Sequence, residues 1–182
     1  MYVDADFAGL WGVEPTTSPI SVKSCTGFVI ALSGCYVLSK SCLQSSIAQS
    51  TGEAEYIALS NSLQALLPIR HALSEILNSI RINDDFSTAI ESKFKGTPSI
   101  SGFQTLVHED NNSALMLATL QRVTNLTKHY AVKLHWFWSV VNEESNRISV
   151  IKIDTHVQRA DYLTKGMPTP GYQSCRKLTQ GW

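Results

Sequence analysis

Residues 50–59 read STGEAEYIAL, and this stretch decides the interpretation of the chain because it predicts the start of a helix. Ser50 followed three positions later by Glu53 has the form of a capping box. Leucines then recur at helical spacing and give the helix an apolar face: Leu59, Leu63, Leu66, Leu67 and Leu73. The pattern predicts a helix that runs to about Leu77 and is kinked or split at Pro68, because proline removes a backbone donor.

Two glutamates in the first turns of this helix face different ways. Glu53 and Glu55 lie two positions apart, which is about 200° around a helix, so they cannot share a face. We expect one to meet solvent and the other to turn toward the body of the fold. A buried carboxylate is costly unless a cation meets it. The helix therefore directs attention to other carboxylates that converge on the same point.

Length and composition suit one folded domain of 182 residues, since 43% of them are hydrophobic. Fifteen basic and fifteen acidic residues cancel, so no overall basic field indicates a nucleic-acid partner. Such a partner would be contacted through a local patch or a bound metal. No signal segment or membrane-spanning apolar run occurs. The cysteines lack metal-type spacing, which favours free buried thiols in a reducing compartment: Cys25, Cys35, Cys42 and Cys175.

The N-terminal part predicts antiparallel strands. Residues 1–8 predict a strand with Asp4 and Asp6 on one face, because residues two apart share a face. Residues 26–32 and 35–40 predict a hairpin around a Ser-Gly turn. The chain opens directly in a predicted strand, and we therefore expect it to be a piece of a longer polypeptide.

The later part predicts crossover connections. Residues 78–103 form an expected surface insertion, and a buried strand over 104–109 ends at a helix-capping cluster. Asp110 thus lies at the tip of a strand, where α/β proteins place ligand groups. Further predicted elements are a helix over 128–144, a strand over 147–153, and a short helix over 157–164 that carries Asp161.

This order predicts an α/β fold with a mixed sheet, antiparallel strands first and crossover helices later. We expect one domain over residues 1–166 and a C-terminal tail over 167–182, which we expect to pack loosely.

Four carboxylates occupy comparable places on separate elements: Asp4, Glu55, Asp110 and Asp161. If they meet, they repel one another and raise each other's pKa. Such a cluster calls for a divalent metal, and hard oxygen ligands suit Mg²⁺ or Mn²⁺. Two such ions about 4 Å apart activate a water and stabilise the leaving oxygen of a phosphodiester.

Six segments, in the right order, resemble the ribonuclease H domain of copia-type retrotransposon Pol polyproteins. They are VDADFAG at 3–9 (YSDADWAG in the family), SCTGFV at 24–29 (STSGYVF), QSTGEAEYIAL at 49–59 (SSTEAEYMAL), EDNNSA at 109–114 (CDNQSA), TKH and HWF at 127–129 and 135–137 (TKHID…HF), and ADYLTK at 160–165 (ADILTK). The chain departs from the pattern at Ala131, where the family has an acid, and at Lys133, where it has arginine.

The resemblance implies a ribonuclease H-like fold, with a mixed five-stranded sheet and helices on both faces. It implies hydrolysis of the RNA strand of RNA–DNA hybrids during reverse transcription, with two Mg²⁺ or Mn²⁺ ions. It carries the family's metal-binding acids over to Asp4, Glu55, Asp110 and Asp161. The implied partners are the hybrid and the reverse transcriptase domain of the same polyprotein, with no membrane. The implied location is intracellular, in a cytoplasmic virus-like particle or the nucleus.

Other side chains are weaker candidates. Asn111, Ser113, Lys128 and His129 are candidates for contact with the hybrid, and are equally well explained as helix caps and a solvated helix start. His156, five residues before Asp161, is a candidate proton shuttle, and the alternative is an exposed loop histidine.

Two other functions stay open. One is a catalytically decayed module that binds or tethers hybrid without cutting it, and the retained acids argue against decay. The other is a nuclease or integrase of the same fold that acts on DNA. The early position of Glu55 speaks against it, since integrase-type sites place their glutamate late.

Overall fold

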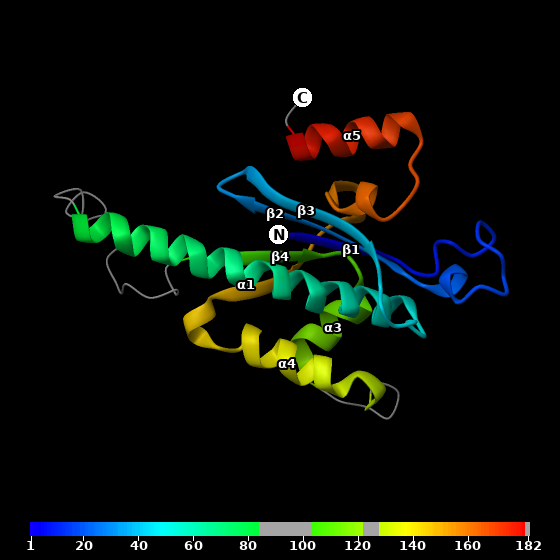
Figure 1. Cartoon of the computed structure of the whole chain (residues 1–182), viewed down its shortest axis with the longest axis horizontal. Coiled ribbons are helices and arrows are strands. Elements are labelled where there is room, and N and C mark those ends of the chain that lie inside the picture. The colour runs from blue at the N-terminus through cyan, green and yellow to red at the C-terminus, as the bar shows by residue number, and fades with distance from the viewer. Residues whose placement is uncertain (84–102, 122–127, 181–182) are drawn as a thin grey trace.

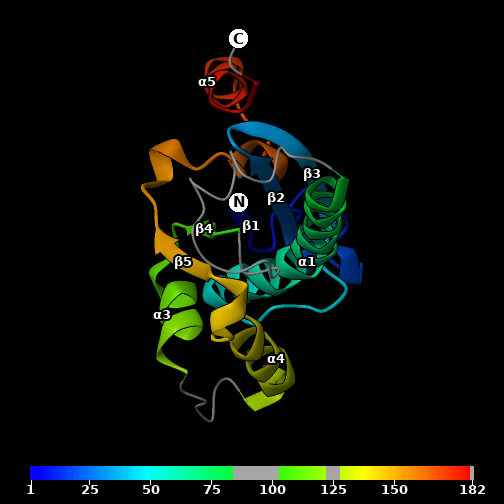
Figure 2. The same ribbon diagram turned by 90° about the vertical axis from the view of Figure 1, so that its left-hand side faces the viewer.

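The computed structural model describes residues 1–83, 103–121 and 128–180. These residues form a mixed five-stranded sheet in the order β3-β2-β1-β4-β5, with α1, α3 and α4 on one side and α5 on the other (Figures 1 and 2). The strands are β1 (Tyr2–Asp6), β2 (Cys25–Leu32), β3 (Cys35–Leu43), β4 (Thr105–Glu109) and β5 (Ile148–Lys152). The sheet and its helices confirm the predicted α/β class and agree with a ribonuclease H-like fold.

The helices are α1 (Thr51–Asn83), α3 (Asn112–Leu120), α4 (Ala131–Val141) and α5 (Thr169–Gln180). Short 3₁₀ turns connect them: η1 (Pro19–Val22), η3 (Lys128–Tyr130), η4 (Glu144–Asn146), η5 (Thr155–Val157) and η6 (Asp161–Leu163). No helix among the described residues combines the length and the apolar character needed to cross a bilayer.

The central strand β1 pairs antiparallel with β2 and parallel with β4, and β4 pairs parallel with β5. β2 and β3 form the predicted hairpin, in which Ser33 and Gly34 have φ of 50° and 85°. Positive φ at both loop residues is the requirement of the hairpin turn whose twist matches that of the strands. The antiparallel-then-parallel order expected from the sequence is therefore confirmed.

The hydrophobic core lies between the sheet and α1. Val3 and Phe28 from the sheet, Leu59 and Leu63 from α1, and Phe137 from α4 are all at most 1% exposed. Each such side chain contributes roughly 1.5–3 kcal/mol when fully buried. This packing holds α1 against β1 and β2, so the first turns of the helix lie close to the central strand of the sheet.

Helix α1 runs continuously through Pro68, so the predicted split is wrong. Proline leaves the carbonyl of Gln64 without its helical donor. Both Gln64 and Pro68 are exposed, which lets water solvate that carbonyl, while the leucines on the other side stay packed. The helix ends at Asn83, beyond the predicted Leu77, and takes in the first residues of the expected insertion. The remainder, 84–102, lies outside the described residues.

Two predicted helices differ from the structure. The helix expected over 128–144 is divided into η3, α4 and η4. The helix expected over 157–164 is wrong, because η5 and η6 take its place. Between these turns lies Gln158, which is buried and donates from Nε2 to the carbonyl of Val3 at 2.8 Å. That contact anchors the segment to β1.

The segment after residue 166 contains helix α5, which the sequence did not lead us to expect. The hydroxyl of Tyr36 on β3 donates to the carbonyl of Leu178 at 3.0 Å, and Cys175 is buried beside Met167. The division into a domain over 1–166 and a tail over 167–182 stays a prediction. All four cysteines are free thiols, as their spacing predicted, but the expected burial is wrong for three of them: only Cys175 is buried.

Candidate metal centre

Three of the four predicted carboxylates converge. One oxygen each of Asp4 on β1, Glu55 on α1 and Asp110 after β4 lie within 4.8 Å of one another. Asp4 and Glu55 are buried, and Asp110 is half-buried. Oxygens around Mg²⁺ lie about 2.1 Å from the ion, so this spacing is close to that of a common ligand shell. We call these three residues the acidic triad.

The local sequence explains why the triad meets. Asp110 is followed by a helix cap, Asn111, whose Oδ1 accepts from the backbone N–H groups of Ser113 and Ala114 and so starts α3 at once. A Cβ on Gly52 would lie 2.8 Å from the Cβ of Ser113. Only glycine therefore lets the starts of α1 and α3 approach this closely, and the approach brings the first turns of α1 to the end of β4.

The start of α1 is fixed by the predicted capping box. Glu53 N–H donates to Ser50 Oγ at 3.1 Å, and the Glu53 carboxylate accepts from the N–H of Gln49 at 2.9 Å. The other Glu53 oxygen lies 3.0 Å from His129 Nε2 on η3. Glu53 is only 5% exposed, so our expectation that one glutamate meets solvent is wrong. A histidine distant in sequence, His129, supplies the partner that makes this burial tolerable.

Glu55 is buried without such partners. It is 7% exposed, and its Oε2 has no hydrogen-bond partner among the described residues. Burial, and the neighbouring carboxyls of Glu109 and Asp4, raise the pKa of Glu55. An orphaned buried carboxylate oxygen next to two other acids is the environment that a bound divalent cation relieves.

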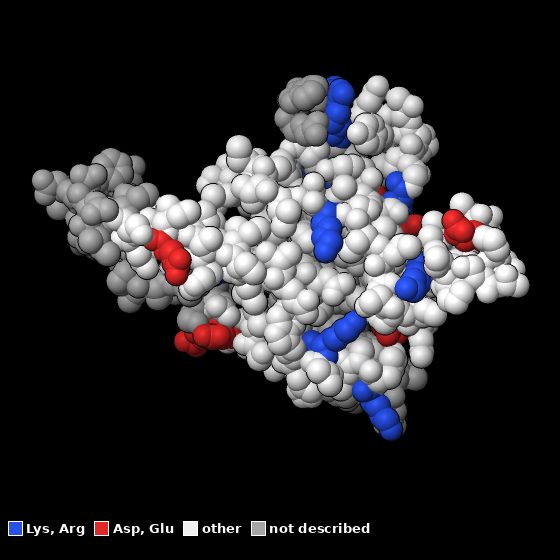
Figure 3. All heavy atoms as spheres, viewed as in Figure 1, with Lys and Arg blue, Asp and Glu red and all other residues white. Residues whose placement is uncertain are grey.

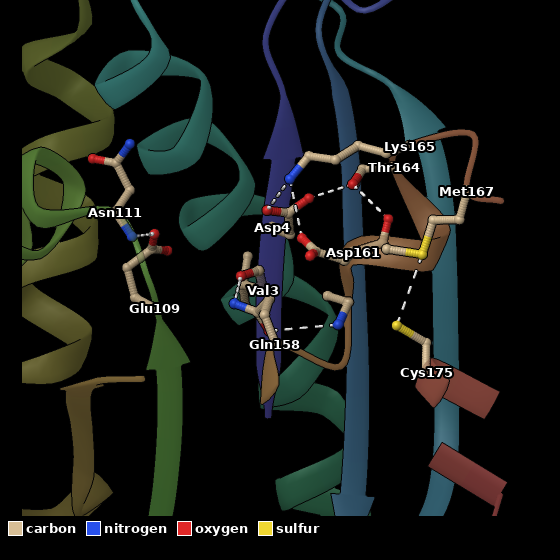
Figure 4. Close-up of polar contacts among 11 residues, drawn as sticks. Val3, Asp4, Glu109, Asn111, Gln158, Asp161, Thr164, Lys165, Met167 and Cys175 are labelled. Carbon is tan, nitrogen blue, oxygen red and sulfur yellow. Dashed lines mark hydrogen bonds and ion pairs between the residues drawn. The ribbon is translucent and has the colours of Figure 1, made fainter. Parts of the chain in front are cut away.

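Sequence reasoning missed Glu109, a fifth carboxyl beside the triad. It is fully buried, and one oxygen accepts from the N–H of Asn111 at 2.9 Å, while Oε2 has no partner in the described part of the chain (Figure 4). Burial raises its pKa, with the Asn111 N–H acting against the shift. The alternation of β4 could have revealed it, because Val107, two residues earlier, points to the same buried face.

Asp161 is attached to the triad through a lysine. Lys165 Nζ lies 3.3 Å from Asp4 Oδ1 and 3.0 Å from Asp161 Oδ1, so its ammonium bridges the two acids (Figure 4). Thr164 Oγ1 donates to the other oxygen of Asp4. Burial raises the pKa of Asp4 to about 6, although Lys165 and Thr164 act in the opposite direction. Asp161 is not among the three carboxylates whose oxygens gather.

A glycine of β2 explains how Lys165 reaches Asp4. Gly27 lies opposite Asp4 in the sheet register. A Cβ on Gly27 would lie 2.6 Å from Thr164 Cγ2, 2.9 Å from Leu163 Cβ and 3.2 Å from the carbonyl oxygen of Ala160. The missing side chain therefore lets η6 and the residues after it settle on β2 beside Asp4.

Three of the five weaker candidates make a structural contact, and the other two are exposed. Asn111 caps α3, Ser113 lies against Gly52, and His129 pairs with Glu53. Lys128 and His156 are exposed, and the N–H of His156 donates to Asp154 Oδ1 in η5. Their roles toward nucleic acid stay predictions.

Basic residues are dispersed on the face drawn in Figure 3. The blue Lys and Arg side chains are separated by uncharged surface and do not merge into one patch there. This dispersal agrees with the zero formal net charge. A nucleic-acid contact on this face would therefore depend on individual cations.

Over 177 residues, the chain is 30% identical to the "Retrovirus-related Pol polyprotein from transposon TNT 1-94" of Nicotiana tabacum. The chain is similar to a region of a retrotransposon Pol polyprotein. The aligned part covers 97% of this chain but 11% of that polyprotein, so the chain spans about a ninth of the relative's length. No protein-family model matches the chain, and no solved structure matches it.

The donors present fit a hard divalent cation. The acidic triad offers carboxylate oxygens alone, which suit Mg²⁺ or Mn²⁺ better than a thiophilic metal. Glu55 Oε2, which has no hydrogen-bond partner in the part of the chain that the structure describes, supports the same conclusion, because a buried acceptor without a donor gains most from a cation.

Proposed function

We propose that this chain is the ribonuclease H region of a retrotransposon Pol polyprotein and that it hydrolyses the RNA strand of RNA–DNA hybrids. The convergence of Asp4, Glu55 and Asp110 carries the proposal, because these residues lie in three of the motifs that resemble the family. Similarity over nearly the whole chain to a retrotransposon Pol polyprotein supports it.

Each residue has a role in this proposal. A bound divalent ion, Mg²⁺ or Mn²⁺, supplies Lewis-acid chemistry toward a phosphodiester. Asp4 on β1, Glu55 on α1 and Asp110 just after β4 would hold it. Asp161 acts beside them through Lys165, whose ammonium orients the carboxylate of Asp4. The buried position of Asp4 and Glu55 excludes water from the inner side of the centre.

The substrate class follows from the same resemblance. A protein selects RNA in a hybrid by contacts to 2′-hydroxyls across the wide minor groove. Because the formal net charge is zero, we propose that the reverse transcriptase domain of the same polyprotein delivers the hybrid.

The test compares three labelled duplexes: an RNA–DNA hybrid, a DNA duplex and an RNA duplex, each incubated with the purified chain with and without Mg²⁺. Cleavage confined to the RNA strand of the hybrid, and dependent on Mg²⁺, is expected. Hybrid binding without cleavage would indicate the decayed module, and cleavage of the DNA duplex would indicate the DNA nuclease. Glu75→Gln, at an exposed acid on α1, is the matched control for substitutions in the triad.

A further inference from the structure

The centre contains a second place where negative oxygens face each other, between Asp4 and Asp161. This place is distinct from the triad, because Asp161 contributes no oxygen to the triad. Asp4 belongs to both places. The gap between Asp4 and Asp161 is bridged by the ammonium of Lys165, at 3.3 Å and 3.0 Å from their Oδ1 atoms (Figure 4).

The fold holds Lys165 at that place from its backbone. Thr164, the preceding residue, donates to the other oxygen of Asp4, and its Cγ2 packs over Gly27. The backbone N–H of Lys165 donates to the carbonyl of Asp161 at 3.1 Å. The carboxylate of Asp161 and the ammonium of Lys165 are therefore held against β1 without a bound metal ion.

The ammonium is charged under ordinary conditions. A lysine side chain carries its positive charge at neutral pH, and the carboxylates of Asp4 and Asp161 lie within 3.3 Å and 3.0 Å of this ammonium. The Lys165 side chain is 39% exposed, so its charge is partly solvated while Asp4 is 1% exposed. A divalent ion that entered between the two acids would meet this fixed positive charge at short range.

The contrast with the triad indicates which place is open to a metal. Glu55 Oε2 is buried without a hydrogen-bond partner among the described residues, whereas the Asp4–Asp161 gap already contains a cation. The triad therefore needs a cation, whereas Lys165 already supplies one between Asp4 and Asp161.

We propose that Lys165 is a built-in cation that takes the second ion position, so that the free protein binds one divalent ion, at Asp4, Glu55 and Asp110. This inference rests on the proposed metal-dependent function and corrects the two-ion stoichiometry that the family resemblance implies. Lys165 acts as a positioning residue through Asp4 and Asp161.

The test counts Mn²⁺ ions bound to the whole chain without nucleic acid, by calorimetry and by the electron paramagnetic resonance signal of free Mn²⁺. The wild-type chain is expected to bind one ion. Lys165→Met, which keeps an unbranched side chain one atom shorter and removes the charge, is expected to bind two, the second at least tenfold more tightly than any second ion in the wild type. Lys165→Arg and the exposed control Lys177→Met are expected to bind one.

The outcomes separate this inference from the proposed function. No binding by the wild type would overturn the metal centre itself. Two ions in the wild type, or one ion in Lys165→Met, would overturn the role of Lys165 and leave the metal centre standing. Circular dichroism checks that each variant is folded. If Lys165→Met does not fold, Lys165→Gln takes its place, and the wild-type stoichiometry alone can still refute the inference.

Discussion

Glu53 and Glu55 are two positions apart on one helix, and both are buried, yet their surroundings differ. The carboxylate of Glu53 is satisfied by the N–H of Gln49 and by the ring of His129. The carboxylate of Glu55 faces other acids and keeps an oxygen without a hydrogen-bond partner in the described residues. The first glutamate holds the helix start, and the second belongs to the candidate metal centre.

Burial of an acid therefore does not by itself indicate function. What separates the two glutamates is whether the protein supplies the donors that a buried carboxylate needs. At a helix cap, backbone N–H groups supply these donors. In a metal site, the bound ion takes the place of the donors.

The largest effect is expected at the triad. Asp110→Asn keeps the size of the side chain and removes a ligand charge, so hybrid cleavage should fall by about 10³-fold or more. The thermal unfolding midpoint should stay near that of the wild type, because Asp110 is half-buried and has no structural ion pair among the described residues. Cleavage assays and circular dichroism of the same preparation measure both. An unfolded variant would place Asp110 with Glu53 among the structural acids.

The metal-free protein should lose stability as the pH rises. The folded-state pKa of Asp4 is raised from 3.8 to about 6, so its protonated form is favoured by folding. This contribution is complete below pH 3.8 and is lost as the pH passes through about 6, and it amounts to about 3 kcal/mol. Urea unfolding at several pH values in a chelating buffer measures it. Saturating Mg²⁺ should reverse the trend. Asp4→Asn should remove the part of the slope below about pH 6 that Asp4 contributes and leave the part that comes from the raised pKa values of Glu55 and Glu109. An unchanged slope in that variant would show that Asp4 does not contribute.

Glu53→Ala should lower the free energy of unfolding by about 2 kcal/mol, because it removes the cap and leaves the Gln49 N–H and His129 without an acceptor. Its affinity for Mn²⁺ should stay unchanged. Glu53→Gln, which keeps one acceptor oxygen, is the matched control and should cost less. Loss of Mn²⁺ binding at full stability would show that the two glutamates are not separate in function.

Glu55→Gln should have the smallest and opposite effect on stability. Removing a carboxyl whose pKa is raised by burial and by Glu109 and Asp4 should stabilise the metal-free protein at neutral pH. The same variant should bind Mn²⁺ more weakly. Paired unfolding and binding curves test this, and a destabilised metal-free variant would contradict the assignment of Glu55 to the metal centre.

Local features of the fold were predictable because their causes are local. The capping box at Ser50 and Glu53 and the turn at Ser33 and Gly34 are fixed by residues within a few positions. The continuity of α1 through Pro68 was not predictable, because it depends on which side of the helix meets solvent. That information resides in the packing of the helix on the sheet.

The candidate metal centre could likewise be predicted only where the causes are local. The four acids could be named from motifs, but the partner of Glu53 is 76 residues away, at His129. The ammonium at Asp4 comes from Lys165, and its arrival depends on the absence of a side chain at Gly27. Only Glu109 could have been found from local alternation with Val107.

The place of β1 in the middle of the sheet has a consequence for synthesis of the chain. β1 is made first, but its parallel neighbour β4 follows about a hundred residues later, with Tyr2 opposite His108. Closing so long a loop makes this pairing a late step in folding. A nascent polypeptide on the ribosome therefore cannot complete the triad around Asp4 until translation has passed residue 110, and Asp4 has no Lys165 ammonium beside it until translation has passed residue 165.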